Sequence, residues 1–201
     1  MYDPFINNFI KNCSKLPGIG TKASERIALF LMQNRQELQE LNKTIELMDK
    51  HIIKCECGFF STSNPCYICN DDKRDKSKIC IVKNMADVIS IEKTKQFNGT
   101  YHILGGLISS IDGCFPQDLN LDNFRDKIIK NKINEIIIAL SATTEAKTTQ
   151  FYILSKIKNL KVNIFEPAHG IPLGADLELL DQATLSAAII SKKEIENNDD
   201  F

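Results

Sequence analysis

The hydrophobic and polar positions follow two different periods along the chain. In the first fifty residues, apolar side chains recur every three or four positions, as at Phe5, Ile6, Phe9 and Ile10 and later at Leu38, Leu41 and Ile45. This spacing predicts amphipathic helices over most of the range from Phe5 to Ile53. Two glycines, Gly18 and Gly20, stand in a connection short enough to predict a tight hairpin between the first two helices.

From Ile79 onward, short runs rich in β-branched residues alternate with helical patterns. The expected strands are 79–82, 101–104, 135–140 and 162–165, and the expected helices are 86–95, 124–131 and 145–158. The order β-α-β-α-β-α-β predicts a mostly parallel sheet with right-handed crossovers and both faces covered. Such sheets carry their sites at the carboxyl ends of the strands.

The charge of the chain is unevenly distributed. The 201 residues carry 25 basic and 26 acidic side chains, but residues 166–201 hold two basic and eight acidic ones, which leaves a mildly basic body. Such a body favours contact with a polyanion. The apolar runs are far shorter than the roughly 18 residues that a membrane span needs, and Asp3 does not suit a signal peptide. We therefore expect a cytoplasmic protein with no membrane partner.

The hairpin segment Leu16-Pro-Gly-Ile-Gly-Thr-Lys-Ala-Ser-Glu-Arg26 has the residues of a phosphate site. Gly18 and Gly20 permit positive φ and close approach of another backbone, and the free N–H groups at the start of the next helix favour an anion. Lys22 and Arg26 lie four positions apart, so both reach one nucleic-acid backbone. The segment resembles the helix-hairpin-helix motif of DNA-binding and repair proteins, which favours DNA contact without sequence preference. A plain turn closed by two glycines is the alternative.

Four of the seven cysteines, Cys55, Cys57, Cys66 and Cys69, fall within fifteen residues. In a cytoplasmic chain such a cluster indicates metal ligands, and four thiolates in one short loop suit a structural, tetrahedral zinc site. The first pair is separated by one residue instead of two, so His51 is an alternative to Cys55 as the fourth ligand. Four reduced thiols without a metal are the competing interpretation.

Other residues near the cluster have simpler interpretations. Gly58 and Asn70, directly after the second and fourth cysteines of the cluster, are types that tolerate a left-handed turn. The remaining cysteines lie beside apolar residues and are expected to be ordinary core thiols: Cys13, Cys80 and Cys114.

The order of these parts resembles the bacterial RecR family of recombination mediator proteins over essentially the whole chain. The resemblance is carried by residues 16–22, the four cysteines with Arg74 and 79–82, the stretch 86–104, and His169-Gly-Ile-Pro-Leu-Gly-Ala-Asp-Leu-Glu178 with 184–186. It implies an α/β protein with a helix-hairpin-helix domain at 1–54, a four-cysteine zinc-finger module at 55–78, a Toprim domain at 79–165 and an extended C-terminal tail at 166–201.

The resemblance also implies a function. Members of this family are non-catalytic, DNA-binding mediators of recombinational DNA repair, which form dimers or ring-like tetramers around DNA and act with RecO and RecF to load recombinase on single strands. The corresponding residues here are Lys22, Arg26, Gly18 and Gly20 for DNA, and the four cysteines for zinc. Glu145 and its neighbours correspond to a docking site for a partner.

The Toprim resemblance raises one enzyme-class alternative. In Toprim enzymes a Glu after the first strand and a later Asp-x-Asp bind magnesium, and such chemistry needs clustered carboxylates. Here Lys83 follows the first expected strand, departing even from the acidic residue usual in RecR, and 141–144 precede a single acid, Glu145. An active Toprim nuclease or primase-like enzyme is therefore the alternative function.

Two further alternatives have less support. A nucleotide-binding enzyme would use the glycines at 105–106 and 170–174, with His102 or His169 as a catalytic group, but the sequence contains no complete phosphate-loop motif. A pure protein-interaction module would bind no DNA at any salt concentration.

Overall fold

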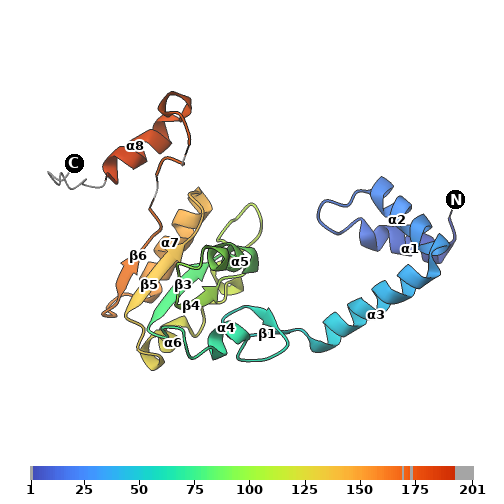
Figure 1. Cartoon of the computed structure of the whole chain (residues 1–201), viewed down its shortest axis with the longest axis horizontal. Helices are drawn as coiled ribbons and strands as arrows, with labels where there is room; N and C mark the ends of the chain where they lie inside the picture. Colours follow the sequence, from blue (N-terminus) through green and yellow to red (C-terminus); the bar gives the residue numbers. More distant parts are fainter. Residues whose placement is uncertain (1, 169, 173, 193–201) are drawn as a thin grey trace, which may run out of the picture. The chain divides into compact units, whose positions relative to one another are not determined.

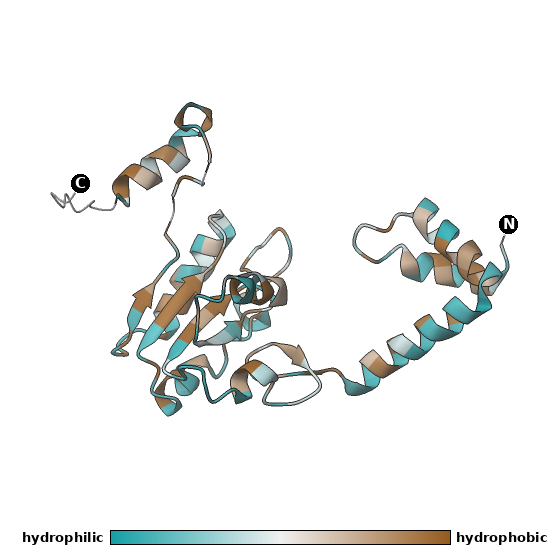
Figure 2. Cartoon of the chain, viewed as in Figure 1, coloured by the Kyte–Doolittle hydropathy of each residue, from teal (hydrophilic) through white to brown (hydrophobic). Residues whose placement is uncertain are grey.

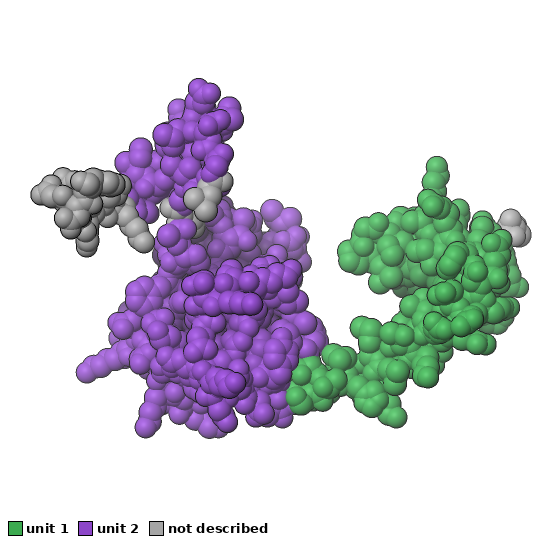
Figure 3. All heavy atoms as spheres, in the orientation of Figure 1, with its two compact units in different colours: residues 1–53, 61–63 green, residues 54–60, 64–201 purple. Residues whose placement is uncertain are grey.

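The computed structural model describes residues 2–168, 170–172 and 174–192, and the chain forms two compact units (Figure 3). Unit 1 comprises residues 1–53 and 61–63, and unit 2 comprises 54–60 and 64–201. The finer boundaries at 54/55, 78/79 and 165/166 stay predictions. No helix among the described residues is long and apolar enough to cross a membrane.

Unit 1 is built from the helices α1 (Pro4–Cys13), α2 (Thr21–Gln33) and α3 (Arg35–His51), which confirms the predicted helical region (Figure 1). The Asp3 carboxylate starts α1 by accepting a hydrogen bond from the Phe5 N–H at 2.9 Å. The small core of unit 1 contains Ile10, Ala28 and Leu31, whereas α3 has no buried residue. Apart from the half-buried Leu38, the apolar positions of α3 are therefore exposed within the single chain.

Unit 2 is organised around a four-stranded parallel sheet in the order β4-β3-β5-β6. The strands are β3 (Lys78–Val82), β4 (Thr100–Ile103), β5 (Glu135–Ala139) and β6 (Asn163–Phe165). The helices α5 (Met85–Thr94), α6 (Phe124–Lys130) and α7 (Thr144–Lys156) connect them in chain order. The predicted β-α-β-α-β-α-β order and the parallel sheet are thus confirmed.

Smaller elements complete the chain. They are the two-stranded ribbon β1 (Ile53–Lys54) and β2 (Phe60–Ser61), the helices α4 (Tyr67–Asn70) and α8 (Gln182–Ile190), and two 3-10 turns at Pro116–Asp118 and Leu177–Leu179. None of the residues of α8 is buried in the single chain. His169 lies outside the described residues.

The two faces of the sheet have separate cores, and the central strands are the most hydrophobic part of unit 2 (Figure 2). On one face, Ile79 and Ile81 of β3 and Ile136 and Ile138 of β5 pack with α6 and α7. On the other face, Cys80 and Val82 of β3 pack with α5 and the four-cysteine segment. Because side chains alternate along a strand, the central strands β3 and β5 contribute to both cores.

The helix boundaries differ from the expected ones by one or two residues, and at the starts of α5 and α7 a capping side chain determines the boundary. The Thr143 hydroxyl accepts a hydrogen bond from the Ala146 N–H at 3.2 Å, so α7 begins one residue earlier than expected. Asn84 and Asp87 cap each other's backbone at the start of α5. Alternating apolar residues alone do not reveal these caps.

Candidate functional site

The four clustered cysteines lie close enough together to hold one metal ion. The Sγ atoms of Cys55, Cys57, Cys66 and Cys69 all lie within 4.8 Å of one another. The Cys57 and Cys66 sulfurs are 3.7 Å apart. Tetrahedral ligation at about 2.3 Å places two sulfurs about 3.8 Å apart, so the spacing fits a metal such as zinc.

The local backbone brings the two cysteine pairs together. Gly58, with φ of +91°, turns the chain after Cys57, and its N–H donates to the Cys55 carbonyl at 2.7 Å. Cys66 stands directly before α4, and its own N–H donates to the Cys55 sulfur at 3.4 Å. The left-handed turn is thus present at Gly58 but not at Asn70, which is the last residue of α4.

The electrostatics of the cluster are unfavourable for four thiolates alone. The hydrogen bond with Cys69 and burial raise the pKa of the Cys57 thiol, and burial raises the pKa of Cys66. Packing several thiolates together is costly, whereas a cation at their centre reverses that effect. The donor set therefore fits a soft divalent metal ion better than it fits free thiols.

The cysteine segment is docked firmly on the sheet. The Ile103 N–H donates to the Cys57 carbonyl at 2.7 Å. The Arg74 guanidinium donates to both carboxylate oxygens of Glu92 on α5 and, at 3.0 Å, to the Gly99 carbonyl. The Tyr101 hydroxyl donates to Glu92 at 2.6 Å. These contacts join the segment after the cysteines to α5 and β4, so the cluster is part of the fold of unit 2.

Of the two glycines in the hairpin before α2, Gly18 has the positive φ that its residue type permits, whereas Gly20 is extended with φ of −84°. Gly18 has φ of +78°, and the Ile19 N–H donates to the Leu16 carbonyl at 3.1 Å. Gly20 caps α2 without a side chain, and its carbonyl accepts bonds from the N–H and the hydroxyl of the buried Ser24. Because no side chain of Gly20 occupies the first N–H groups of α2, they stay available to an anion.

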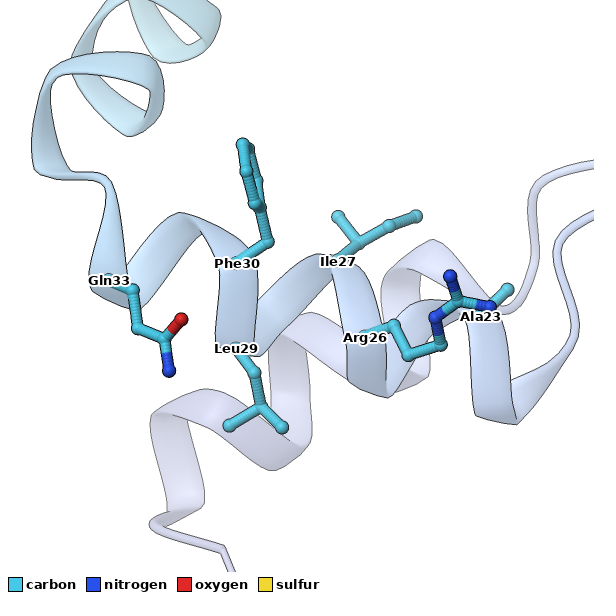
Figure 4. A pocket seen from close by; sticks show the side chains of 6 residues that line it. All are labelled: Ala23, Arg26, Ile27, Leu29, Phe30 and Gln33. Carbon is cyan, nitrogen blue, oxygen red and sulfur yellow. The ribbon is translucent and has the colours of Figure 1, made fainter.

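Lys22 and Arg26 are both exposed on α2. Arg26 borders a shallow pocket together with Ala23, Ile27 and Phe30, whose side chains Figure 4 shows along the helix. Phe30 is 54% exposed. The surface next to the hairpin thus combines two cations with uncovered apolar side chains, which sequence reasoning about the glycines and cations did not reveal.

The carboxyl edge of the sheet lacks clustered acids in the described part of the chain. Lys83 follows β3 and is exposed, and Glu145 lies half-buried in the first turn of α7. Groups of three or more potential metal ligands among the described residues consist of the cysteine cluster alone. Asp112 lies in the turn of a short hairpin, where its N–H donates to the Ser109 hydroxyl at 3.2 Å.

His102 and the three cysteines outside the cluster are partly or fully buried in the fold. Burial lowers the pKa of His102 to about 3, and its Nε2 donates to the Asn120 carbonyl. Burial raises the pKa of the Cys80 thiol to about 12, as expected for a core thiol. Cys13 and Cys114 are only half-buried.

Comparison with known proteins agrees with this architecture. Family models match as a RecR helix-hairpin-helix at residues 6–48, a Toprim domain at 77–166 and a RecR C-terminal region at 170–193. The Recombination protein RecR of Tropheryma whipplei (strain TW08/27) is 38% identical over 197 residues, covering 97% of this chain and all of that protein. The chain belongs to the RecR family.

Other relatives have similar extents. The Recombination protein RecR of Erythrobacter litoralis is 35% identical over 193 residues and covers 95% of this chain and 98% of its own. The Recombination protein RecR of Bartonella quintana is 38% identical over 188 residues, which cover 92% of this chain and 94% of that protein. The resemblance inferred from the sequence motifs is therefore confirmed, as is the combination of helix-hairpin-helix and Toprim parts in one chain.

Proposed function

We propose that this protein is a non-catalytic recombination mediator in DNA repair, which contacts DNA backbone through the hairpin before α2. The observation that carries the proposal is the exposed α2 N-terminus with its uncapped N–H groups, flanked by Lys22 and Arg26. Phosphate oxygens are the ligands that such a combination binds, and backbone contacts carry no sequence preference. Membership of the RecR family supports the role in recombination.

The proposed assembly follows from the same family. The chain acts as a dimer or ring-like tetramer that surrounds DNA, and it works with RecO and RecF to load recombinase on single strands. Glu145, at the half-buried start of α7, is the proposed docking residue for a partner. The exposed apolar side chains of α3 and α8, such as Ile45, Met48 and Ile190, are consistent with further contacts between chains.

The metal in the cysteine cluster is proposed to be zinc. The four sulfurs lie close enough together to supply the four ligands of a tetrahedral site, which supports Cys55 over His51 as the fourth ligand. Zinc would supply no catalysis here but would neutralise the thiolates and join the ends of a segment that has no separate core. Its role is to hold the Cys55–Cys69 segment on the sheet.

The test of DNA contact is a salt titration of binding to a labelled duplex with a single-stranded tail. The wild type is compared with Lys22→Ala/Arg26→Ala and with Lys43→Ala/Lys50→Ala, which removes two exposed cations of α3. Affinity falls as salt rises, and the magnitude of the slope of log affinity against log salt should be smaller by about 1.8 for the hairpin variant. Each lost phosphate contact reduces that magnitude by about 0.9. Equal slopes for all three proteins would contradict the proposed hairpin contact.

The alternative function is an active Toprim nuclease or primase-like enzyme. It needs several acids at the carboxyl edge, where the described residues provide Glu145 without a partner cluster. Incubation of the same DNA with protein and magnesium distinguishes the two. Our proposal predicts intact, unextended DNA, whereas cut or extended DNA would support the enzyme.

A further inference from the structure

The two turns that lead into β5 and β6 have closely similar sequences. Lys130-Asn131-Lys132-Ile133-Asn134 precedes β5, and Lys158-Asn159-Leu160-Lys161-Val162-Asn163 leads into β6. Each turn contains one non-glycine residue with positive φ, Lys132 at 52° and Asn159 at 70°. Both turns therefore connect the end of a helix to the start of a strand through a left-handed residue.

These turns lie side by side at the amino edge of the sheet. β5 and β6 are parallel neighbours, with Glu135 opposite Asn163. The Asn163 N–H donates to the Asn134 carbonyl at 2.9 Å, which joins the two turns directly. Arg125 of α6 donates to the carbonyls of Lys156 and Lys158 at 3.2 and 3.0 Å, which fixes α6 against the second turn.

The edge is strongly basic. Residues 125–135 and 156–161 contain seven basic and two acidic side chains. One of the acids, Glu135, is paired with Lys78 at 3.3 Å. Across the described residues, no ion pair or hydrogen bond involves the exposed ammonium groups of four lysines: Lys130, Lys132, Lys158 and Lys161. The positive charge at this edge is therefore greater than the negative charge that nearby side chains provide.

Helix capping does not account for this excess. Cations are favourable near a helix C-terminus because they complement its dipole. The last carbonyls of α7 already accept bonds from Arg125 and from backbone N–H groups, and those of α6 accept bonds from the Asn131 and Ile133 N–H groups. The four lysines thus have no acceptor in the described fold, whereas the interleaved asparagines add neutral donors of the kind that contact phosphates.

We propose that the amino edge of the sheet, formed by residues 130–134 and 158–163, is a second nucleic-acid backbone site. It is separate from the hairpin and lies at the opposite edge from the carboxyl ends where ligands of parallel sheets usually bind. This inference rests on the proposed DNA-binding function and extends it to the α/β unit. A run of phosphates is the ligand, and no base-specific contact is involved.

The experiment measures the salt dependence of binding to the labelled tailed duplex for four full-length proteins. They are the wild type, the edge variant Lys130→Gln/Lys132→Gln/Lys158→Gln/Lys161→Gln, the hairpin variant Lys22→Ala/Arg26→Ala, and a charge-matched control, Lys43→Gln/Lys50→Gln/Lys83→Gln/Lys147→Gln. Thermal unfolding of each checks that these exposed substitutions leave the fold intact. Binding of labelled polyglutamate is measured in parallel as the probe for an acidic protein partner.

For the edge variant, we expect the magnitude of the slope of log affinity against log salt to be smaller by about 2 to 4, at about 0.9 per lost phosphate contact. The control should keep most of the wild-type slope. Equal slopes for the edge variant and the control would overturn it. Loss of polyglutamate binding with an unchanged DNA slope would also overturn it, in favour of an acidic protein. If the hairpin variant alone keeps the wild-type slope, the proposed hairpin contact fails and the edge site stands. If the wild type binds no DNA, both fail.

Discussion

At the scale of single residues, Gly58 is constrained both by its backbone conformation and by its surroundings. Its φ of +91° favours glycine, and a Cβ there would lie 2.7 Å from the Ile103 carbonyl oxygen. Gly105 has a similar φ of +88° but open space around the same position. Substitution of Gly105 therefore measures the cost of a left-handed backbone alone, whereas substitution of Gly58 adds the cost of a steric clash.

Gly58→Ala is predicted to lower the free energy of unfolding by roughly 2–4 kcal/mol, because about 1–2 kcal/mol of backbone strain adds to overpacking against Ile103. Gly105→Ala should cost only the strain, about 1–2 kcal/mol. Denaturant unfolding in excess zinc measures both. Equal losses for the two variants would show that the cysteine segment does not pack on β4 as described.

Glu92 is the second critical residue, since it accepts hydrogen bonds from Arg74 and Tyr101. The bonds from Arg74, followed by the bond from Tyr101, hold the pKa of Glu92 below its ordinary value. A carboxylate with a lowered pKa in the folded state stabilises the protein above its ordinary pKa, and this contribution disappears as the pH falls through the lowered value.

Glu92→Gln should therefore lower the free energy of unfolding by about 2 kcal/mol near pH 7, the usual value of a hydrogen bond to a charged group. Asp122→Asn, at an exposed acid, serves as the control and should change little. The difference between wild type and Glu92→Gln should shrink as the pH falls through and below the ordinary pKa range of a glutamate, because the pKa of Glu92 is lowered in the folded state. A difference that stays constant over this range would contradict the ion pair.

At the scale of elements, the cysteine segment shares a core with the sheet. Its Cys57, Phe59 and Ile68 are buried with Val88 of α5 and Tyr101 of β4. Loss of the metal should therefore affect unit 2 and leave the three helices of unit 1, which have their own small core, in place.

Chelation at pH 7 is predicted to increase amide exchange in residues 54–60, 64–70 and β4 while the rate in α1 and α2 stays unchanged. Cys57→Ser should reproduce the effect and reduce metal content from about one ion per chain, whereas Cys13→Ser should not, because Cys13 lies outside the cluster. Mass spectrometry and elemental analysis provide the measurements. Uniform exchange changes in both units would contradict separate cores.

Much of this element structure could be predicted from the sequence. The helical spacing up to Ile53 and the alternation of strands and helices after Ile79 reflect burial patterns that are local in the chain. The cysteine spacing also predicted the metal cluster, because four thiols so close along the chain can meet in one loop. The contacts of Arg74 with Glu92 join residues 18 positions apart, and nothing in the local pattern indicated them. The exposed apolar side chains of α2 were likewise missed, because periodicity indicates an apolar face but not whether anything covers it.

At the scale of the whole molecule, the chain combines a helix-hairpin-helix unit, which carries the proposed phosphate contact, with an α/β unit that carries the four-cysteine cluster. The part that matches a Toprim domain has Lys83 and residues 141–144 at the carboxyl edge of its sheet. Among the described residues, the acids at this edge do not cluster as a site for catalytic metal ions requires, which is consistent with the proposed mediator role.

Mediation without catalysis is tested most directly by the rate at which recombinase assembles on single-stranded DNA coated with single-strand-binding protein. We predict that this protein, together with a RecO partner, accelerates assembly and leaves the DNA intact. Lys22→Ala/Arg26→Ala should lose most of that acceleration, whereas Lys43→Ala/Lys50→Ala should retain it. No acceleration by the wild type, or nicked or extended DNA in its presence, would contradict the account.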